Sequence, residues 1–202
     1  METTQPETEL QPEPVAEQPA NWKRFVLDIL ETLVLAVVLY FGINAVSARV
    51  RVDGFSMRPT LQDGEYILVN KLAYKTGEPH RGDIVVFIFP VDPSEDLIKR
   101  VIGLPGESVS VHNGIVKVNG VALTEPYIAS PPAYEDDRVV PDGDLYVLGD
   151  NRNDSRDSHQ WGLLPIENVI GRAVLIYWPP KEWQVINHDL QNIVGQRSLS
   201  LK

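Results

Sequence analysis

The sequence predicts a mainly β fold, in which an antiparallel β-sheet domain is preceded by one transmembrane helix. Two features of the chain predict it. One long apolar run lies near the N-terminus, at residues 25–46. Beyond residue 48, short runs rich in β-branched and aromatic residues alternate with turn residues, and no long stretch has the period of a helix. A length of 202 residues suits one folded domain with appendages.

The apolar run is close to the roughly 20 residues that a helix needs to cross a bilayer. Its acidic residues, Asp28 and Glu31, lie near one end. We therefore predict a transmembrane helix over residues 22–48. Two interpretations compete with it. One is a removable signal peptide, because residues 46–48 (Val-Ser-Ala) resemble the small-residue site where an exported precursor is cut. The other is a buried helix of a soluble core.

The rest of the chain divides into three predicted segments. Residues 1–21 are rich in Pro, Glu, Gln and Thr and bury too little apolar surface to offset the entropy of ordering, so we predict a disordered acidic tail. The folded domain is predicted over residues 49–180, and residues 181–202 form a C-terminal tail. Basic residues occur on both sides of the helix, so charge does not determine its orientation.

The composition excludes several kinds of chemistry. The formal net charge is −10, and the five glutamates of residues 1–20 account for half of it. An acidic chain lacks the basic face that binds phosphates, so we expect no nucleic-acid partner. The chain has no cysteine, which excludes disulfides, cysteine-ligated zinc and a thiol nucleophile. Any catalytic chemistry must therefore use oxygen or nitrogen atoms.

Strands are predicted where β-branched and aromatic residues cluster between turns. Asn113 and Gly114 separate two alternating runs, which indicates a hairpin because both residues tolerate positive φ. Asn119 and Gly120 mark a second turn. The other predicted strands are residues 66–69, 84–89, 144–148 and 173–178.

Three segments gather polar residues among these strands: residues 54–61 (GFSMRPTL), 98–107 (IKRVIGLPGE) and 149–159 (GDNRNDSRDSH). A fourth, residues 82–87 (GDIVVF), lies between the first two. In this order, and after an apolar segment, they resemble the signature boxes of bacterial type I signal peptidases. The resemblance extends over about residues 52–172.

The resemblance implies a serine endopeptidase with a Ser-Lys dyad and no metal or other cofactor. Ser56 would attack the scissile carbonyl, Lys99 would take the serine proton as general base, Ser155 would orient the lysine amine, and Asp157 would support the loop from behind. The substrates would be exported precursor proteins, cut after small residues in an Ala-X-Ala pattern. The protein would be a single-pass protein of the bacterial plasma membrane, in contact with its lipid. Its catalytic domain would lie outside the cytoplasm, and residues 1–21 inside.

Acid–base chemistry supports the choice of Lys99 independently. A serine hydroxyl needs a nearby base, and a lysine with its ordinary pKa of about 10.4 is protonated at neutral pH unless burial disfavours the charge. Leu97 and Val101 would share a strand face with Lys99 while Ile98 alternates behind, so the surroundings are apolar. Arg100 is excluded because a guanidinium is not deprotonated in proteins. The competing interpretation is a charged pair on a solvated edge strand.

The oxyanion region is incomplete in the sequence. The backbone N–H of Ser56 is one expected donor. Some members of the family carry a serine hydroxyl two residues before the nucleophile, where this chain has Gly54. A second donor is therefore not identified.

The loop at residues 150–159 permits two other sites. One is a metal site built from Asp150, Asp154, Asp157 and His159, although the spacing of an EF-hand is absent. The other is a Ser-His-Asp triad with His159 as base. The family commonly has arginine at this position, so the resemblance gives His159 a structural part. The remaining histidines are expected to be solvated: His80, His112 and His188.

Two other functions compete with a signal peptidase. A self-cleaving repressor also uses a Ser-Lys pair, but it would carry a DNA-binding module and no membrane span. A membrane-anchored module that only binds peptides would have degenerate motifs, whereas Ser56, Lys99 and Ser155 are intact. We expect a monomer that binds its substrate as a strand added to a sheet edge. Because the nine residues from Ser47 to Phe55 span at most about 30 Å, Ser56 must work near the membrane surface.

Overall fold

Short antiparallel strands make up most of the folded chain. A computed structural model describes residues 22–188, and within this range two sheets contain eight and four strands. The mainly β, antiparallel fold class predicted from the sequence is confirmed. The disordered tail predicted over residues 1–21 lies outside the described residues, as do residues 189–202.

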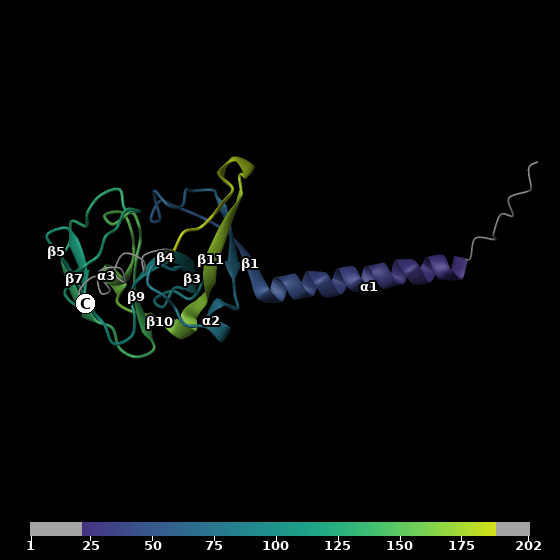
Figure 1. Ribbon diagram of the computed structural model, residues 1–202, viewed down its shortest axis with the longest axis horizontal. Coiled ribbons are helices and arrows are strands. Elements are labelled where there is room, and N and C mark those ends of the chain that lie inside the picture. The colour runs from purple at the N-terminus through teal and green to yellow at the C-terminus, as the bar shows by residue number, and fades with distance from the viewer. Residues whose placement is uncertain (1–21, 189–202) are drawn as a thin grey trace, which may run out of the picture. The chain divides into compact units, whose positions relative to one another are not determined.

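The larger sheet has the strand order β1-β2-β11-β3-β4-β9-β10, and β12 also pairs with β11 (Figure 1). The long strand β11 pairs with β2 along one part and with β3 along another, so it joins the two halves of the sheet. The strands of this sheet are β1 (Ser47–Arg51), β2 (Tyr66–Asn70), β3 (Ile84–Ile88), β4 (Asp96–Gly103), β9 (Asp144–Leu148), β10 (Leu164–Pro165), β11 (Val169–Trp178) and β12 (Gln184–Val185).

The smaller sheet has the order β7-β6-β5-β8, and in Figure 1 it lies at the end of the domain away from β1. The predicted hairpin turn at Asn113 and Gly114 is confirmed, with φ of 52° and 75°. Its strands are β5 (Ser108–His112), β6 (Ile115–Val118), β7 (Val121–Ala122) and β8 (Asp136–Val139). The short helices of the domain are α2 (Ala73–Thr76), α3 (Ser158–Trp161), η1 (Ile166–Asn168) and η2 (Pro180–Glu182).

The centre of the larger sheet is buried on both faces. Strand β3 lies between β11 and β4, and its residues from Ile84 to Phe87 have no exposed surface. Apolar residues on adjacent positions of β4 pack into different clusters: Val101 contributes to one core and Ile102 to another. This follows from the two-residue period of a strand. Neighbouring residues of β4 therefore face different environments.

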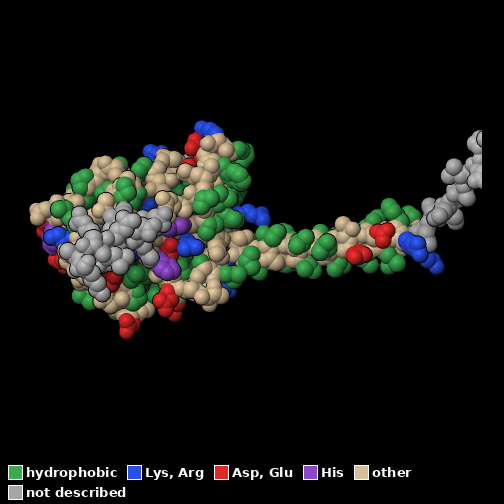
Figure 2. Space-filling model, in the orientation of Figure 1, with side chains coloured by type: hydrophobic (Ala, Val, Ile, Leu, Met, Phe, Trp, Pro, Cys, Tyr) green, Lys and Arg blue, Asp and Glu red, His purple; other side chains and the backbone are tan. Residues whose placement is uncertain are grey.

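Helix α1 (Trp22–Val46) begins where the transmembrane helix was predicted and ends two residues earlier. The chain divides into two units after Phe41. No residue of the helix is buried, which contradicts its interpretation as the core helix of a soluble protein. Hydrophobic side chains cover it along its length (Figure 2), and among residues 22–188 it is the one helix that is long and apolar enough to cross a membrane.

Part of the segment predicted as a C-terminal tail packs on the sheet. Strand β12 pairs with β11, and Ile186 is 5% exposed within a core that also contains Val52 and Met57. The expectation that His188 is solvated is wrong, because its Nδ1 accepts a hydrogen bond from the Ile84 N–H at 3.2 Å. Burial lowers the pKa of His188 below its ordinary value, so the neutral ring is suited to accept this bond.

Candidate active site

Ser56 lies in the long connection between β1 and β2. Backbone bonds close the base of this connection: the Val52 N–H donates to the Glu65 carbonyl oxygen at 2.8 Å. Two apolar side chains, Met57 and Leu61, anchor it in the core with 2% and 0% of their surfaces exposed. Ser56 is therefore held on a loop that is fixed at its base and by its own buried side chains.

Lys99 lies on β4 and contacts Ser56 directly. Its Nζ is 2.8 Å from Ser56 Oγ and 2.9 Å from the Ile98 carbonyl oxygen. The two residues are 43 positions apart in the sequence. Lys99 is 2% exposed, which contradicts the competing interpretation of a solvated edge strand. The structure thus brings together the two residues predicted to form the dyad.

Burial governs the protonation of this lysine. Desolvation lowers the pKa of Lys99 from its ordinary value of 10.5 to about 8. The charges of Asp157 and Asp150 act in the opposite direction, and that of Arg156 acts in the same direction as burial. At pH 7 about one tenth of such a group is unprotonated, compared with less than one thousandth of an ordinary lysine. The amine can therefore accept a proton near neutral pH.

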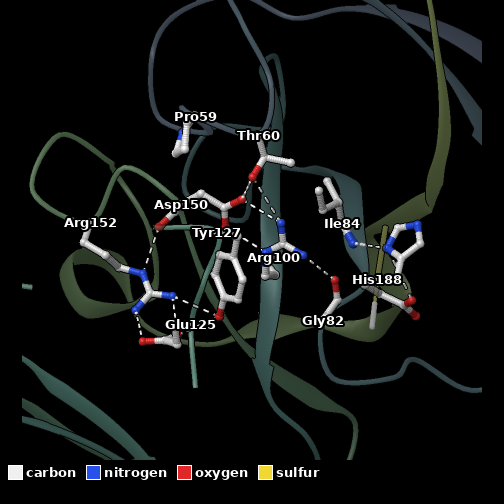
Figure 3. A network of polar contacts seen from close by, with 12 residues as sticks. Pro59, Thr60, Gly82, Ile84, Arg100, Glu125, Tyr127, Asp150, Arg152 and His188 are labelled. Atoms are coloured by element: carbon white, nitrogen blue, oxygen red, sulfur yellow. Dashed lines mark hydrogen bonds and ion pairs between the residues drawn. The ribbon is translucent and has the colours of Figure 1, made fainter. Parts of the chain in front are cut away.

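Arg100 follows Lys99 and so lies on the opposite face of β4. Its guanidinium is paired with Asp150 (Figure 3). Its Nε and Nη2 donate to the two carboxylate oxygens of Asp150 at 2.8 and 2.6 Å. Its Nη1 donates to the Gly82 carbonyl oxygen at 2.9 Å, and its guanidinium lies 4.1 Å from the centroid of the Tyr127 ring. Sequence reasoning excluded Arg100 as a base but did not identify these partners.

A second buried ion pair lies on the other side of Tyr127 (Figure 3). Arg152 donates to both oxygens of Glu125 at 2.9 and 2.6 Å, and its Nε donates to the Gly149 carbonyl oxygen at 3.1 Å. Sequence reasoning missed Glu125 and Tyr127, because they lie in a proline-containing stretch without a strand or helix pattern. The pair connects the region around β7 to the loop that follows β9.

The loop that follows β9, residues 149–157, packs against the loop that carries Ser56. The Asn151 N–H donates to the Ser56 carbonyl oxygen at 3.0 Å. Gly149 packs so closely here that a Cβ would lie 2.2 Å from Ser155 Oγ and 2.5 Å from the Ser56 carbonyl oxygen. A side chain at position 149 would therefore displace Ser56, and glycine is required by this close approach.

Asp157, the last residue of the 149–157 loop, is fully buried. Its Oδ2 accepts the Gly149 N–H at 2.9 Å, and its Oδ1 lies 2.6 Å from Nδ1 of His159. The His159 ring stacks on Tyr134 with a centroid distance of 3.8 Å. The carboxylate thus holds the start of the loop in place, while His159 contacts Asp157 and Tyr134 and the Ser56 hydroxyl contacts Lys99.

Ser155 lies beside Gly149 and is 7% exposed. Its hydroxyl has no hydrogen-bond partner among residues 22–188. The residue is thus placed at the site, but the hydrogen bond to the lysine amine expected from the resemblance is not formed in this structure.

Gly54 adopts a φ of +95°, a backbone conformation that favours glycine. Its N–H donates to Asp63 Oδ1 at 2.8 Å. This amide is therefore engaged within its own loop. The Gly54 N–H is already bonded to Asp63 and does not act as the second oxyanion donor in this arrangement.

The residues of the alternative metal site contact different partners. Asp150 pairs with Arg100, while Asp157 contacts His159 and the Gly149 amide. Within the described range, no group of three His, Asp or Glu side chains is placed to hold a metal ion.

A groove of about 280 Å³ lies over Ser56 and Lys99. Residues 50–54 line one wall, and residues 96–98 of β4 line the other. Strand β4 pairs with β3 from Asp96 to Arg100, but its pairing with β9 begins only at Arg100. Within residues 22–188, no strand pairs with the edge of β4 from Asp96 to Lys99 on the groove side.

Comparison with known proteins identifies the family of the chain. A family described as "Signal peptidase, peptidase S26" matches residues 23–178. The chain belongs to the S26 signal peptidase family. A signal peptidase I from Leptolyngbya laminosa is 45% identical over 176 residues, which cover 83% of this chain and 86% of that protein. A probable signal peptidase I-2 from Synechocystis sp. is 44% identical over 173 residues, covering 82% and 79%.

A more distant relative comes from a plant. The thylakoidal processing peptidase 1 of Arabidopsis thaliana chloroplasts is 40% identical over 146 residues, covering 66% of this chain and 43% of that protein. Signal peptidases of this family are membrane-associated serine peptidases that act on exported precursor proteins with signal peptides. The sequence-based assignment to type I signal peptidases is confirmed, and the N-terminal helix is consistent with a membrane anchor.

Proposed function

We propose that this protein removes signal peptides with a Ser56–Lys99 dyad. The contact of 2.8 Å between Lys99 Nζ and Ser56 Oγ is the observation that carries the proposal. The lowered pKa of Lys99, about 8, supports it because only the neutral amine can accept a proton. Burial of the Lys99 amine accounts for the lowered pKa.

The reaction proceeds in two acyl-transfer steps. Neutral Lys99 accepts the proton from Ser56 as Oγ attacks the scissile carbonyl carbon, forming a tetrahedral intermediate. The Ser56 N–H stabilises the oxyanion. The lysine then donates its proton to the departing amine, which leaves an acyl-enzyme on Ser56. In the second step Lys99 takes a proton from water, the resulting hydroxide attacks the ester, and the proton returns to Ser56.

Two residues of the 149–157 loop support the dyad in this proposal. Asp157 acts by holding Gly149, whose close packing sets the position of the Ser56 backbone. Ser155 acts by orienting the lysine amine. Its buried hydroxyl has no partner within residues 22–188 and so can rotate toward the amine when substrate binds.

The substrate binds as an added strand along the free edge of β4. The backbone groups of Asp96–Lys99 that face the groove provide hydrogen bonds for an extended peptide. The groove of about 280 Å³ beside this edge has to hold several residues of an extended peptide at once, which is compatible with the small residues of an Ala-X-Ala pattern. The sequence predicted that the substrate binds at a sheet edge but did not identify the strand, and we propose β4.

Helix α1 anchors the protein in the bacterial plasma membrane, with the catalytic domain on the extracytoplasmic side. Strand β1 begins at Ser47, directly after the helix ends at Val46. The short connection from the helix to Ser56 holds the dyad near the bilayer surface, where a membrane-held signal peptide presents its cleavage site. Residues 1–21 would then lie in the cytoplasm.

The test is cleavage of a purified precursor by the full-length protein in lipid vesicles. We expect Ser56→Ala and Lys99→Ala each to lose cleavage by at least about 1000-fold, as for residues that act as one catalytic unit. Lys75→Ala is the matched control, because Lys75 is exposed on α2. Cleavage at the wild-type rate by either dyad variant would exclude the mechanism.

A further inference from the structure

Arg156 lies between two buried residues of the 149–157 loop, yet its own side chain is half exposed. Ser155 is 7% exposed and Asp157 is fully buried, whereas 51% of the Arg156 side chain is accessible. The residue has no role in the mechanism above. Its contacts lie on a different element from those of its neighbours.

Arg156 contacts the turn that joins β3 to β4, at residues 89–95. Its guanidinium lies 4.6 Å from the centroid of the Phe89 ring and forms an ion pair with Glu95. Phe89 is itself anchored: it is 3% exposed, and its ring packs edge-to-face on Trp161 at 5.5 Å. The arginine therefore rests on a fixed surface.

The turn leads directly into the free edge of β4. The Phe89 N–H donates to the Glu95 carbonyl oxygen at 2.9 Å, and the Glu95 N–H donates to the Asp92 carbonyl oxygen at 3.1 Å. Asp96, the next residue, is the first of the edge that lines the groove. Any displacement of Glu95 would therefore be transmitted to the edge that ends at Lys99.

The charge of Arg156 also acts on the dyad. Asp157 and Asp150 favour the protonated form of Lys99, whereas burial and Arg156 favour its neutral form. On the side of the turn, Glu95 forms the ion pair with the guanidinium. The pKa of Asp92 is lowered mainly by the hydrogen bonds from Ser94, and the charge of Arg156 adds to this effect. Arg156 therefore interacts both with the acids of the turn and with the buried lysine.

We propose that Arg156 is a positioning residue for the peptidase reaction: it bridges the 149–157 loop to the β3–β4 turn, and so holds Ser155 and the free edge of β4 in place around Ser56. The proposal rests on the Ser56–Lys99 mechanism. It assigns a specific task to an exposed side chain that contacts neither member of the dyad.

The test compares four variants of the full-length protein in vesicles, with kcat and KM for precursor cleavage measured across the pH range. Arg156→Gln removes the bridge and the charge. We expect a several-fold higher KM. The rise of kcat/KM with pH on the acid side, here called the acid limb, should move to higher pH by roughly half a unit, and this shift alone lowers the active fraction at pH 7 about threefold. Arg156→Lys keeps the charge and should restore the limb.

Glu95→Gln tests the bridge from the other side. It removes the ion pair but leaves the arginine charge, so KM should rise while the limb does not move upward. Arg138→Gln is the control: Arg138 is a comparably exposed arginine, paired with Asp136 in the smaller sheet. It should match the wild type in both quantities.

An Arg156→Gln variant with wild-type KM and a wild-type acid limb would refute the bridge. If that variant fails to fold, Glu95→Gln decides, and an unchanged KM there refutes it equally. The two proposals fail separately. Undiminished cleavage by Ser56→Ala refutes the dyad, whereas an inactive Ser56→Ala combined with unaltered Arg156→Gln kinetics refutes only the role of Arg156.

Discussion

The two faces of strand β4 place two adjacent basic residues in different electrostatic environments. Lys99 and Arg100 are each 2% exposed. The lysine amine contacts a hydroxyl and a carbonyl, neither of which carries a charge, whereas the arginine contacts both oxygens of Asp150. Burial without a neutralising contact lowers the pKa of a lysine, and burial against a carboxylate keeps a cation charged. One strand therefore carries a reactive amine on one face and a structural ion pair on the other.

The largest effect on activity is expected when Lys99 is replaced by arginine, the residue found on the other face of β4. Lys99→Arg keeps the positive charge but removes the proton acceptor, because a guanidinium is not deprotonated in proteins. Cleavage of a precursor should fall by at least about 1000-fold in single-turnover measurements. Lys75→Arg serves as the control. A loss of less than tenfold would show that Lys99 is not the base.

On the face of β4 that carries Arg100, the free energy of unfolding should depend most on the carboxylate of Asp150. Asp150→Ala leaves Arg100 buried and unpaired, which should lower the free energy of unfolding by about 3–5 kcal/mol. Urea unfolding of the protein in detergent measures the change. Asp142→Ala, at an exposed turn position, should stay within about 0.5 kcal/mol of the wild type. Equal effects of the two substitutions would contradict the importance of the ion pair.

Removing the reactive lysine should stabilise the fold while abolishing activity. The folded-state pKa of about 8 lies below the unfolded value of 10.5, so below pH 8 the folded state carries the full cost of a buried charge. Lys99→Met should gain roughly 3 kcal/mol at pH 7. As pH rises through 8 towards 10.5, the wild type should gain stability and the difference should disappear. A pH-independent difference would mean that Lys99 does not titrate in this range.

The smallest effect is the pH dependence of the wild type. Below the pKa of Lys99 only the neutral fraction is active, so kcat/KM should rise about tenfold per pH unit and level off near pH 8. The His159→Ala variant should keep this limb, because His159 contacts Asp157 and Tyr134. A limb that disappears with His159 would instead support the Ser-His-Asp triad.

Much of the site could be predicted because its chemistry is contained in short segments. The serine and the lysine were predicted from the resemblance of their segments to the signal peptidase motifs, and the preference for Lys99 over Arg100 follows from proton chemistry. The Asn-Gly hairpin follows from local φ preferences. The partners of Arg100 and Arg152 could not be predicted, since Asp150 and Glu125 lie 50 and 27 positions away and no local pattern says which side chains they meet.

The sequence by itself determined the apolar helix and several of the strands, because these depend on backbone preferences and apolar patterns within a few residues. Its resemblance to the signal peptidase motifs named the two residues proposed for the dyad. Only the tertiary structure decided that Ser56 and Lys99 meet across 43 positions, that His188 docks on β3, and that the β4 edge is free beside the groove. Burial is a property of the folded chain. It is burial that turns an ordinary lysine into a candidate base and its neighbour into half of an ion pair.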